Sequence, residues 1–200
     1  LEVQQVVFSG GEALMHSNLW TFCAALRAEG IKITLLSTGL LLRPKAADVV
    51  TWSDEVIVSL DGSEAVHDRI RNVPGAYRKL KEGVAALRER DPDFPVTGRC
   101  VLQRLNFRDF PHIIEAARDT GLDQISFLGA DVSSLAFNRP RPLPGERVAE
   151  IALTANEARE FEAILARTLT SHRDAFAAGF VAESPAKLRG IVQYYAALAG

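Results

Sequence analysis

Apolar positions follow two periods along the chain, and the two periods alternate from residue 3 to about residue 129. Short apolar runs that are typical of buried strands occupy residues 3–8, 31–36, 55–60, 96–102 and 125–128. Most of these runs are followed by apolar residues at helical spacing, which predicts helices over about 19–29, 44–50, 77–87 and 110–120. This alternation predicts parallel strands joined by crossover helices.

The pattern leaves the architecture of this α/β core open. Runs such as Val56-Ile57-Val58 are continuously apolar, as expected for a sheet that is covered on both faces. An open doubly wound sheet and a partial or whole TIM-type barrel both produce this alternation. The pattern alone does not separate them.

Beyond residue 129 the strand-and-helix rhythm stops. Residues 138–145 contain three prolines and predict an exposed loop. A helix is predicted over 154–173, with Thr154 and Glu157 forming a capping box, and another over 184–198. The chain therefore divides into a core over residues 1–145 and a helical segment over residues 146–200.

Composition narrows the function classes. With 23 basic and 25 acidic side chains, the 200-residue chain has a net charge of −2 and no basic face that would predict binding to nucleic acid or a membrane surface. No apolar run approaches the roughly 20 residues of a bilayer span. No signal peptide is evident, and the first residue is Leu1 rather than Met, so a piece of a longer cytoplasmic protein is expected. Cys23 and Cys100 are expected to be buried free thiols.

Candidate chemistry gathers where three successive strands end. Gly10-Gly11-Glu12 follows the first, Ser37-Thr38-Gly39 the second, and Ser59 and Asp61 close the third. Each group alone is typical of a turn or a helix cap. Together they predict a polar ligand site, because the carboxyl ends of parallel strands meet at one edge. Glu12 beside two glycines suits a ligand ammonium group.

Longer motifs join these groups into one signature. Phe8-Ser9-Gly10-Gly11-Glu12 is followed by Ser37-Thr38-Gly39 and by Val58-Ser59-Leu60-Asp61-Gly62, His67-Asp68-Arg69-Ile70-Arg71 and Pro74-Gly75-Ala76-Tyr77. The chain thereby resembles the radical S-adenosylmethionine (SAM) superfamily, and most closely its branch with a C-terminal SPASM or twitch extension. The resemblance implies a partial (β/α)₆ TIM-type barrel that lacks its first βα unit, with C-terminal helices leading to an absent extension.

The resemblance also implies roles for individual residues. Gly10, Gly11 and Glu12 would hold the amino group of SAM, with Ser37 and Thr38 beside them, although Asn is lost from the family's usual Thr-Asn-Gly. Ser59 would contact the ribose or carboxylate of SAM, and Arg71 would pair with the carboxylate. Asp61, Arg99 and Gln103 would face the barrel interior and contact substrate, although Arg99 equally suits a structural ion pair. Asn106 suits a structural or a SAM-contacting role, and the four histidines (His16, His67, His112 and His172) are expected at the surface or at caps.

The family's cysteine motif C-x₃-C-x₂-C is absent from these residues. The resemblance therefore implies a [4Fe–4S] cluster whose ligands lie outside this chain, and no metal ligand within it. In the full-length enzyme, SAM would be cleaved reductively at that cluster to a 5′-deoxyadenosyl radical that acts on a peptide or cofactor-precursor substrate. Flavodoxin or ferredoxin would supply the electron, and residues 1–200 alone would be inactive.

Two alternatives remain from the sequence. A non-catalytic barrel that binds SAM or recognises a peptide would share most of the signature. An ordinary TIM-barrel lyase or aldolase is disfavoured, because the lysines lie mostly on predicted helices or their first turns rather than at strand ends.

Overall fold

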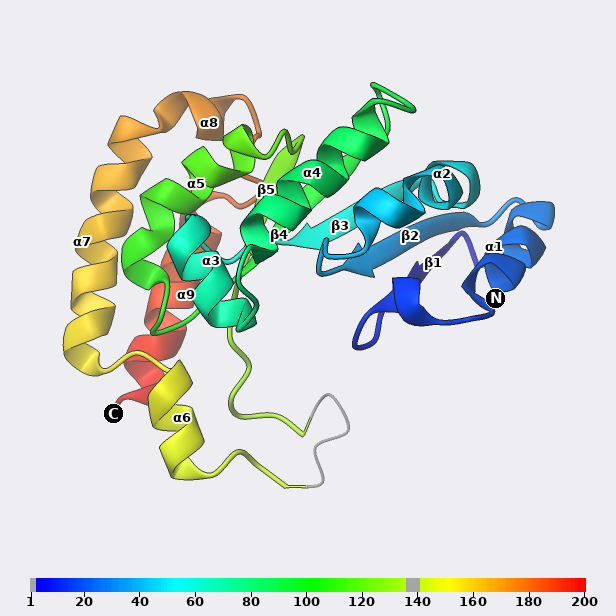
Figure 1. Ribbon diagram of the computed structural model, residues 1–200. Coiled ribbons are helices and arrows are strands. Elements are labelled where there is room, and N and C mark those ends of the chain that lie inside the picture. The colour runs from blue at the N-terminus through cyan, green and yellow to red at the C-terminus, as the bar shows by residue number, and fades with distance from the viewer. Residues whose placement is uncertain (1–2, 136–140) are drawn as a thin grey trace.

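The computed structural model describes residues 3–135 and 141–200 and is built on a five-stranded parallel sheet (Figure 1). The strands follow one another across the sheet in chain order. They are β1 (Gln5–Phe8), β2 (Lys32–Ser37), β3 (Glu55–Ser59), β4 (Val96–Leu102) and β5 (Gln124–Gly129). Every crossover thus moves to the next strand in the same direction, whereas a doubly wound sheet reverses direction at a switch point. The strand order confirms the α/β fold with a partial-barrel topology.

Helices connect the strands on one face of the sheet. They are α1 (Leu19–Ala28), α2 (Leu42–Trp52), α3 (Glu64–Arg71) with α4 (Ala76–Arg88), and α5 (Phe110–Asp119). Two short 3₁₀ helices, η1 (Ala13–Met15) and η2 (Phe107–Asp109), precede α1 and α5. The sequence pattern did not predict α3, which lies between β3 and α4.

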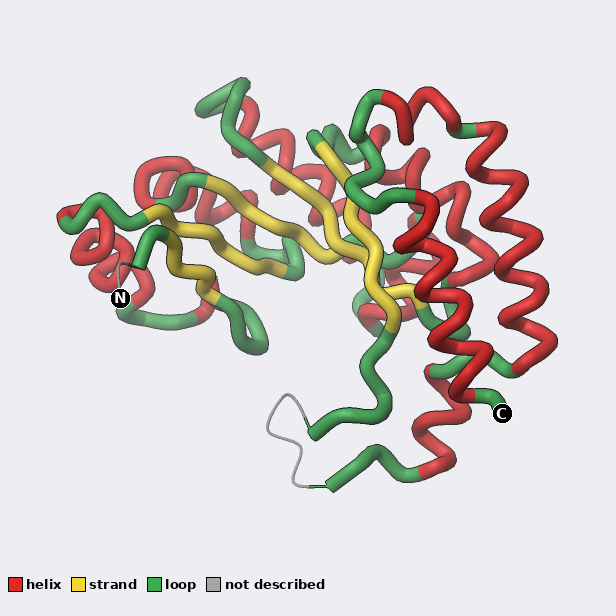
Figure 2. The backbone as a smooth tube through the Cα atoms, turned by 180° about the vertical axis from the view of Figure 1, so that it is seen from behind, coloured by secondary structure: helices red, strands yellow, loops and turns green. Residues whose placement is uncertain are grey.

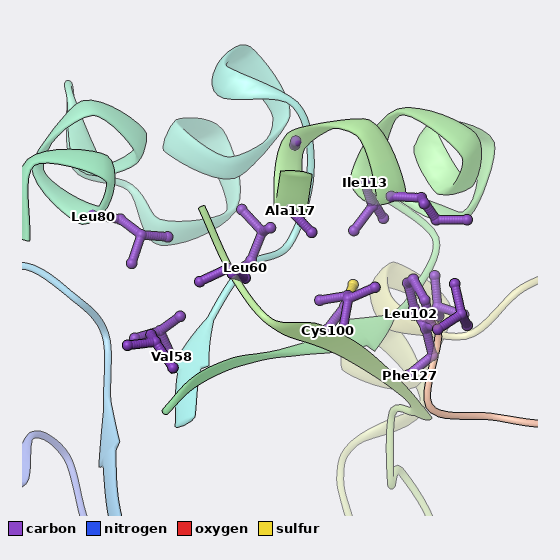
Figure 3. Close-up of a cluster of buried hydrophobic side chains, with 14 of the residues drawn as sticks. Val58, Leu60, Leu80, Cys100, Leu102, Ile113, Ala117 and Phe127 are labelled. Atoms are coloured by element: carbon purple, nitrogen blue, oxygen red, sulfur yellow. The ribbon is translucent and has the colours of Figure 1, made fainter. Parts of the chain in front are cut away.

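The two faces of the sheet differ in burial. In β3, Val56 and Val58 are fully buried, whereas Ile57 and Ser59 are half-buried. The buried set faces the helices and forms the core with α4 and α5 (Figure 3). None of the helices α1, α2, α4 and α5 covers the other face, which faces the viewer in Figure 2. The expectation of a sheet covered on both faces is therefore wrong, and the uncovered face is called the concave face below.

The C-terminal segment packs as a second helical layer beside β5. It contains α6 (Gly145–Ile151), α7 (Ala155–Ser171), α8 (Arg173–Ala177) and α9 (Pro185–Leu198). The predicted capping box is confirmed, since Glu157 N donates to Thr154 Oγ1 and Thr154 N donates to Glu157 Oε2. Phe161 of α7 contacts the ring of Phe110 at 5.8 Å, so one buried cluster extends across both parts of the chain.

Two smaller features complete the fold. Val181 pairs with Ile125 in a parallel bridge, which adds a strand-like segment to the outer edge of β5. Of the loop predicted over 138–145, residues 138–140 lie outside the described residues, 141–144 form no helix or strand, and Gly145 begins α6. Within the described ranges, no helix has the length and apolar character that crossing a membrane requires.

Candidate functional site

Glu12 joins the carboxyl ends of β1 and β2. Its backbone caps η1, and Oε1 accepts a hydrogen bond from Leu14 N at 3.2 Å. Its Oε2 accepts three hydrogen bonds, from Ser37 Oγ at 3.1 Å, Thr38 N at 2.8 Å and Thr38 Oγ1 at 2.6 Å. Glu12, Ser37 and Thr38 are thus in direct contact, whereas the sequence predicted only that they lie at the same edge of the sheet. We call Gly10, Gly11, Glu12, Ser37 and Thr38 the β1–β2 mouth.

The two glycines of the β1–β2 mouth leave space beside Glu12. Gly10 has a φ of +137°, a conformation that side chains disfavour. A Cβ added at Gly10 or Gly11 would meet no atom within 4 Å. Backbone groups at these positions are therefore open to close approach by a ligand, and a methyl group there would fill that approach.

The next strand end carries an ion pair. Asp61, two residues beyond the end of β3, is only 2 % exposed, and its Oδ2 lies 2.6 Å from Nε of Arg71 at the end of α3. Burial raises the pKa of Asp61, and the Arg71 charge opposes that rise. Ser59 is half-buried at the end of β3. The structure therefore places Asp61 behind Arg71, where it holds the guanidinium that the sequence assigned to a ligand carboxylate.

Two buried side chains brace the backbone of Asp61. His67 Nδ1 accepts a hydrogen bond from Asp61 N at 3.1 Å, and Asn106 Nδ2 donates to the Asp61 carbonyl at 2.8 Å. Asn106 Oδ1 also accepts from Gln103 N at 2.8 Å, so Asn106 ties the end of β4 to the end of β3. His67 is fully buried, which contradicts the expected surface role, and burial together with the Arg71 charge lowers its pKa to about 4. Both residues are structural in this geometry.

The last part of the signature also serves the fold. The carboxylate of Asp68 accepts hydrogen bonds from Gly75 N at 2.6 Å and Tyr77 N at 2.8 Å, and thereby caps α4. The Tyr77 hydroxyl donates to Asp119 Oδ2 at 2.9 Å and so links α4 to α5. No separate role was predicted for Asp68 from the sequence, although its place in the His-Asp motif was the signal. We call His67, Asp68 and Tyr77, with Asn106, the α3–α4 brace.

The remaining predicted residues lie on and after β4. Arg99 is half-buried and is paired in register with Ser59 of β3 and Ser126 of β5. Arg99 makes no ion pair with any residue that the structure describes, so the structural ion pair considered from the sequence is not formed. Gln103 is half-buried just beyond β4, where its carbonyl accepts hydrogen bonds from the turn that contains Asn106.

The cysteines do not fit an iron–sulfur cluster. Cys23 in α1 and Cys100 in β4 are both fully buried in the core, and burial raises the pKa of each thiol. A thiolate is the form that binds metal, so these sites disfavour it. Residues 3–135 and 141–200 also contain no group of three or more His, Cys, Asp or Glu side chains that could hold a metal ion. The residues around Glu12, by contrast, fit a ligand with an ammonium group.

The loop after β5 begins beside α9. Its first residues, Asp131 and Ser133, line a pocket of about 490 Å³ together with Gly129 of β5 and with Lys187 and Tyr194 of α9. The sequence left open whether this loop lines the substrate mouth or only joins the core to an extension. Its described part lies at the carboxyl end of β5, on the same edge as the other candidate residues.

Known proteins are similar in sequence to this chain. The AdoMet-dependent heme synthase of Methanosarcina barkeri (strain Fusaro / DSM 804) is 27 % identical over 119 residues, which are 58 % of this chain and 34 % of that protein. The PqqA peptide cyclase of Rhodopseudomonas palustris is 29 % identical over 163 residues, 79 % of this chain and 43 % of that protein. The chain thus spans between about a third and somewhat over two fifths of these relatives.

A solved structure shares the fold, and a family model matches the sequence. Streptococcus suis SuiB bound to S-adenosylmethionine superposes with a TM-score of 0.58 at 10 % identity, over 84 % of this chain and 37 % of that one. The model of the Radical SAM superfamily matches residues 1–117, more than half of the chain. The chain belongs to the radical SAM superfamily.

Proposed function

We propose that this chain is the SAM-binding part of a radical SAM enzyme that acts on a peptide or a cofactor precursor. The observation that carries the proposal is the Glu12 carboxylate, held by Ser37 and Thr38 next to two glycines that leave open space. The relatives' names, a heme synthase and a peptide cyclase, support the two substrate classes. In this family, SAM and a [4Fe–4S] cluster together supply the radical chemistry when bound.

Glu12 would bind the ammonium group of SAM. Its Oε2 is occupied by three donors, whereas Oε1 accepts one hydrogen bond from the described residues, that of Leu14 N, and keeps room for another. The three donors also fix the orientation of the carboxylate before any ligand arrives. A cation bound there gains a charge-assisted hydrogen bond without reordering the protein.

Arg71 would bind the carboxylate of SAM. Asp61 contacts its Nε, so the guanidinium is held from one side while its other nitrogens make no ion pair with the described residues. The side chain of Arg71 is 26 % exposed, so the free part of the guanidinium can reach a ligand. Arginine suits this task because its planar fork donates two parallel hydrogen bonds to a carboxylate. Ser59 would lie between the two charged groups and position the ribose side.

The cluster itself would be held by cysteines outside residues 1–200, since Cys23 and Cys100 are core residues. Residues 1–200 would therefore bind SAM without cleaving it. The core would occupy residues 1–145, and residues 146–200 would lead towards a further C-terminal part. A flavodoxin or ferredoxin would reduce the complete enzyme.

SAM binding tests the proposal directly. Titration calorimetry with SAM should show saturable binding to the chain, and Glu12→Gln should weaken it by about tenfold or more, since a hydrogen bond to a charged group contributes roughly 1.5–3 kcal/mol. Glu29→Gln is the matched control, because Glu29 is exposed beyond α1. Equal affinity in Glu12→Gln and the parent chain would refute the role of Glu12, and no binding at all would refute the proposed function.

A further inference from the structure

Arg99 is a charged side chain that has no ion-pair partner among residues 3–135 and 141–200. Its Nε is buried, yet it makes no hydrogen bond with the residues that the structure describes. A buried polar atom without a partner loses its hydration and gains nothing in exchange, and for a charged group that loss is large. A buried atom of this kind in a native protein needs an explanation, and a bound ligand that accepts a hydrogen bond from it is one.

The side chain of Arg99 lies on the concave face of the sheet. Its neighbours along β4, Gly98 and Cys100, are buried against the helices, so Arg99 faces the opposite way. In the register of the sheet, Arg99 pairs with Ser59 of β3 on one side and with Ser126 of β5 on the other. The three residues form a row across the sheet, with the guanidinium between two hydroxyl-bearing residues. The concave face is the side of the sheet that faces the viewer in Figure 2.

The acidic residues of β3 and of the turn that follows it are already engaged. Asp61 pairs with Arg71, and Glu55, near the start of β3 on the same face, accepts a hydrogen bond from Thr34 at 2.8 Å. The positive charge of Arg99 is therefore not balanced by a protein carboxylate across the described residues. An anion from outside the chain would complete the site.

SAM does not supply that anion in the proposed arrangement. SAM carries a single carboxylate, which is assigned to Arg71, and its ammonium and sulfonium groups are both positive and would be repelled by a guanidinium. A second molecule must bring the negative charge. We infer that the substrate carries a carboxylate and that Arg99, with Ser126 beside it, binds it on the concave face. This inference rests on the proposed function, because it takes Arg71 as the residue that binds SAM.

Heteronuclear NMR of the arginine Nε–Hε groups tests the inference on the intact chain. The Arg99 signal is assigned by its loss in Arg99→Lys, and the Arg71 signal by its loss in Arg71→Lys. Saturating SAM should shift the Arg71 signal strongly and the Arg99 signal only weakly, because SAM would contact Ser59 beside Arg99 but would not bind the Arg99 guanidinium. Sodium succinate, added next as a carboxylate probe, should shift the Arg99 signal saturably. Arg167, which is exposed on α7, serves as the control and should not respond.

A second readout does not depend on the Arg99 signal. The backbone amide of Ser126, which pairs in register with Arg99, should also report the succinate titration. Arg99→Gln should raise the succinate midpoint at this amide by about tenfold, as expected for the loss of a charged hydrogen-bonding partner. Unchanged signals elsewhere in the sheet show that the variant is folded.

The outcomes separate this inference from the proposed function. A shift of Arg99 by SAM alone that is as large as that of Arg71, or a succinate response no greater than that of Arg167, would overturn the carboxylate site. Failure of SAM to shift Arg71 would overturn the proposed function, and with it the assignment of the Arg99 anion to a substrate. A saturable succinate response of Arg99, after a SAM response that is larger at Arg71 than at Arg99, supports both.

Discussion

Sequence motifs marked both the β1–β2 mouth and the α3–α4 brace, but the side chains of the two regions make different kinds of contact in the structure. In the β1–β2 mouth, Glu12 gathers donors from a neighbouring strand end and leaves open space beside it. In the α3–α4 brace, His67 Nδ1, the Asp68 carboxylate and the Tyr77 hydroxyl each make hydrogen bonds inside the protein. A long signature can thus identify a family while most of its residues build the scaffold rather than touch the ligand.

Asp61 and Arg71 connect the two regions. The α3–α4 brace holds Asp61 through His67 and Asn106, and Asp61 in turn holds Arg71. Under the proposed function, the signature would bear on SAM binding mainly through Arg71 and Ser59. Substitutions in the brace should change stability and leave the affinity for SAM near that of the parent chain, and Gly11→Ala in the mouth should do the reverse.

The largest expected effect in the brace is a loss of stability in acid through His67. In the folded chain its pKa is about 4, below the ordinary 6.5 that the unfolded chain retains. Between these values the unfolded state binds the extra proton, so the free energy of unfolding falls as the pH drops from 6.5 towards 4. The fall is about 3 kcal/mol in total, at roughly 1.4 kcal/mol per pH unit. Urea unfolding followed across this range measures it.

His67→Gln should remove that dependence, because glutamine does not titrate. His112→Gln is the control: the His112 side chain is 60 % exposed, and the slope should persist in that variant. An identical slope in His67→Gln and the parent chain would contradict the assignment to His67. The comparison uses slopes, so a uniform loss of stability in the glutamine variant does not affect it.

Much of the fold follows from the sequence because strands and amphipathic helices carry strong periodic signals. The β4 strand spans the residues that the apolar pattern predicted, Val96–Leu102. The helix α3 was missed because it is only 8 residues long and its larger apolar positions are reduced to Val66 and Ile70, with His67 as its only buried residue. The helix α6 was missed for the same reason, since no residue in it is buried. Both helices are held by polar contacts that depend on the rest of the fold.

The candidate site was predictable only as a set of strand ends. Alternation along β3 pointed Asp61 into the barrel, whereas the structure buries it against Arg71, a residue ten positions on. That partnership requires α3 to turn back over the end of β3, which no local pattern encodes. The burial of His67 is also a tertiary effect, because isolated sequence gives no reason to place an ionisable ring in the core.

A smaller effect is expected from Asp68→Ala. Burial alone would raise the pKa of Asp68, but the hydrogen bonds from the Tyr77 and Gly75 amides hold it below the ordinary value. Removing the carboxylate leaves the start of α4 uncapped and should lower the free energy of unfolding by about 1–2 kcal/mol. Glu89→Ala, at the exposed end of α4, should change it little. SAM affinity should stay within twofold of the parent chain, and a large loss of affinity would show that the brace acts on the ligand.

The smallest expected change in stability lies in the mouth, at Gly11. A Cβ at this position meets no atom within 4 Å, so Gly11→Ala should alter the free energy of unfolding by less than about 0.5 kcal/mol. The same methyl group stands where a ligand would approach the backbone, so SAM affinity should fall a few-fold. Calorimetry of SAM binding and urea unfolding of one sample measure both quantities.

Gly10→Ala is the matched comparison for Gly11→Ala. Gly10 has equal space around it but a φ of +137°, so its alanine variant should also lose about 1–3 kcal/mol of stability through backbone strain. If Gly11→Ala leaves SAM affinity unchanged, the ligand does not pass close to this backbone, and the open space beside Glu12 is only a turn. A loss of affinity without a loss of stability at Gly11, set against a loss of both at Gly10, separates ligand approach from chain conformation within two adjacent residues.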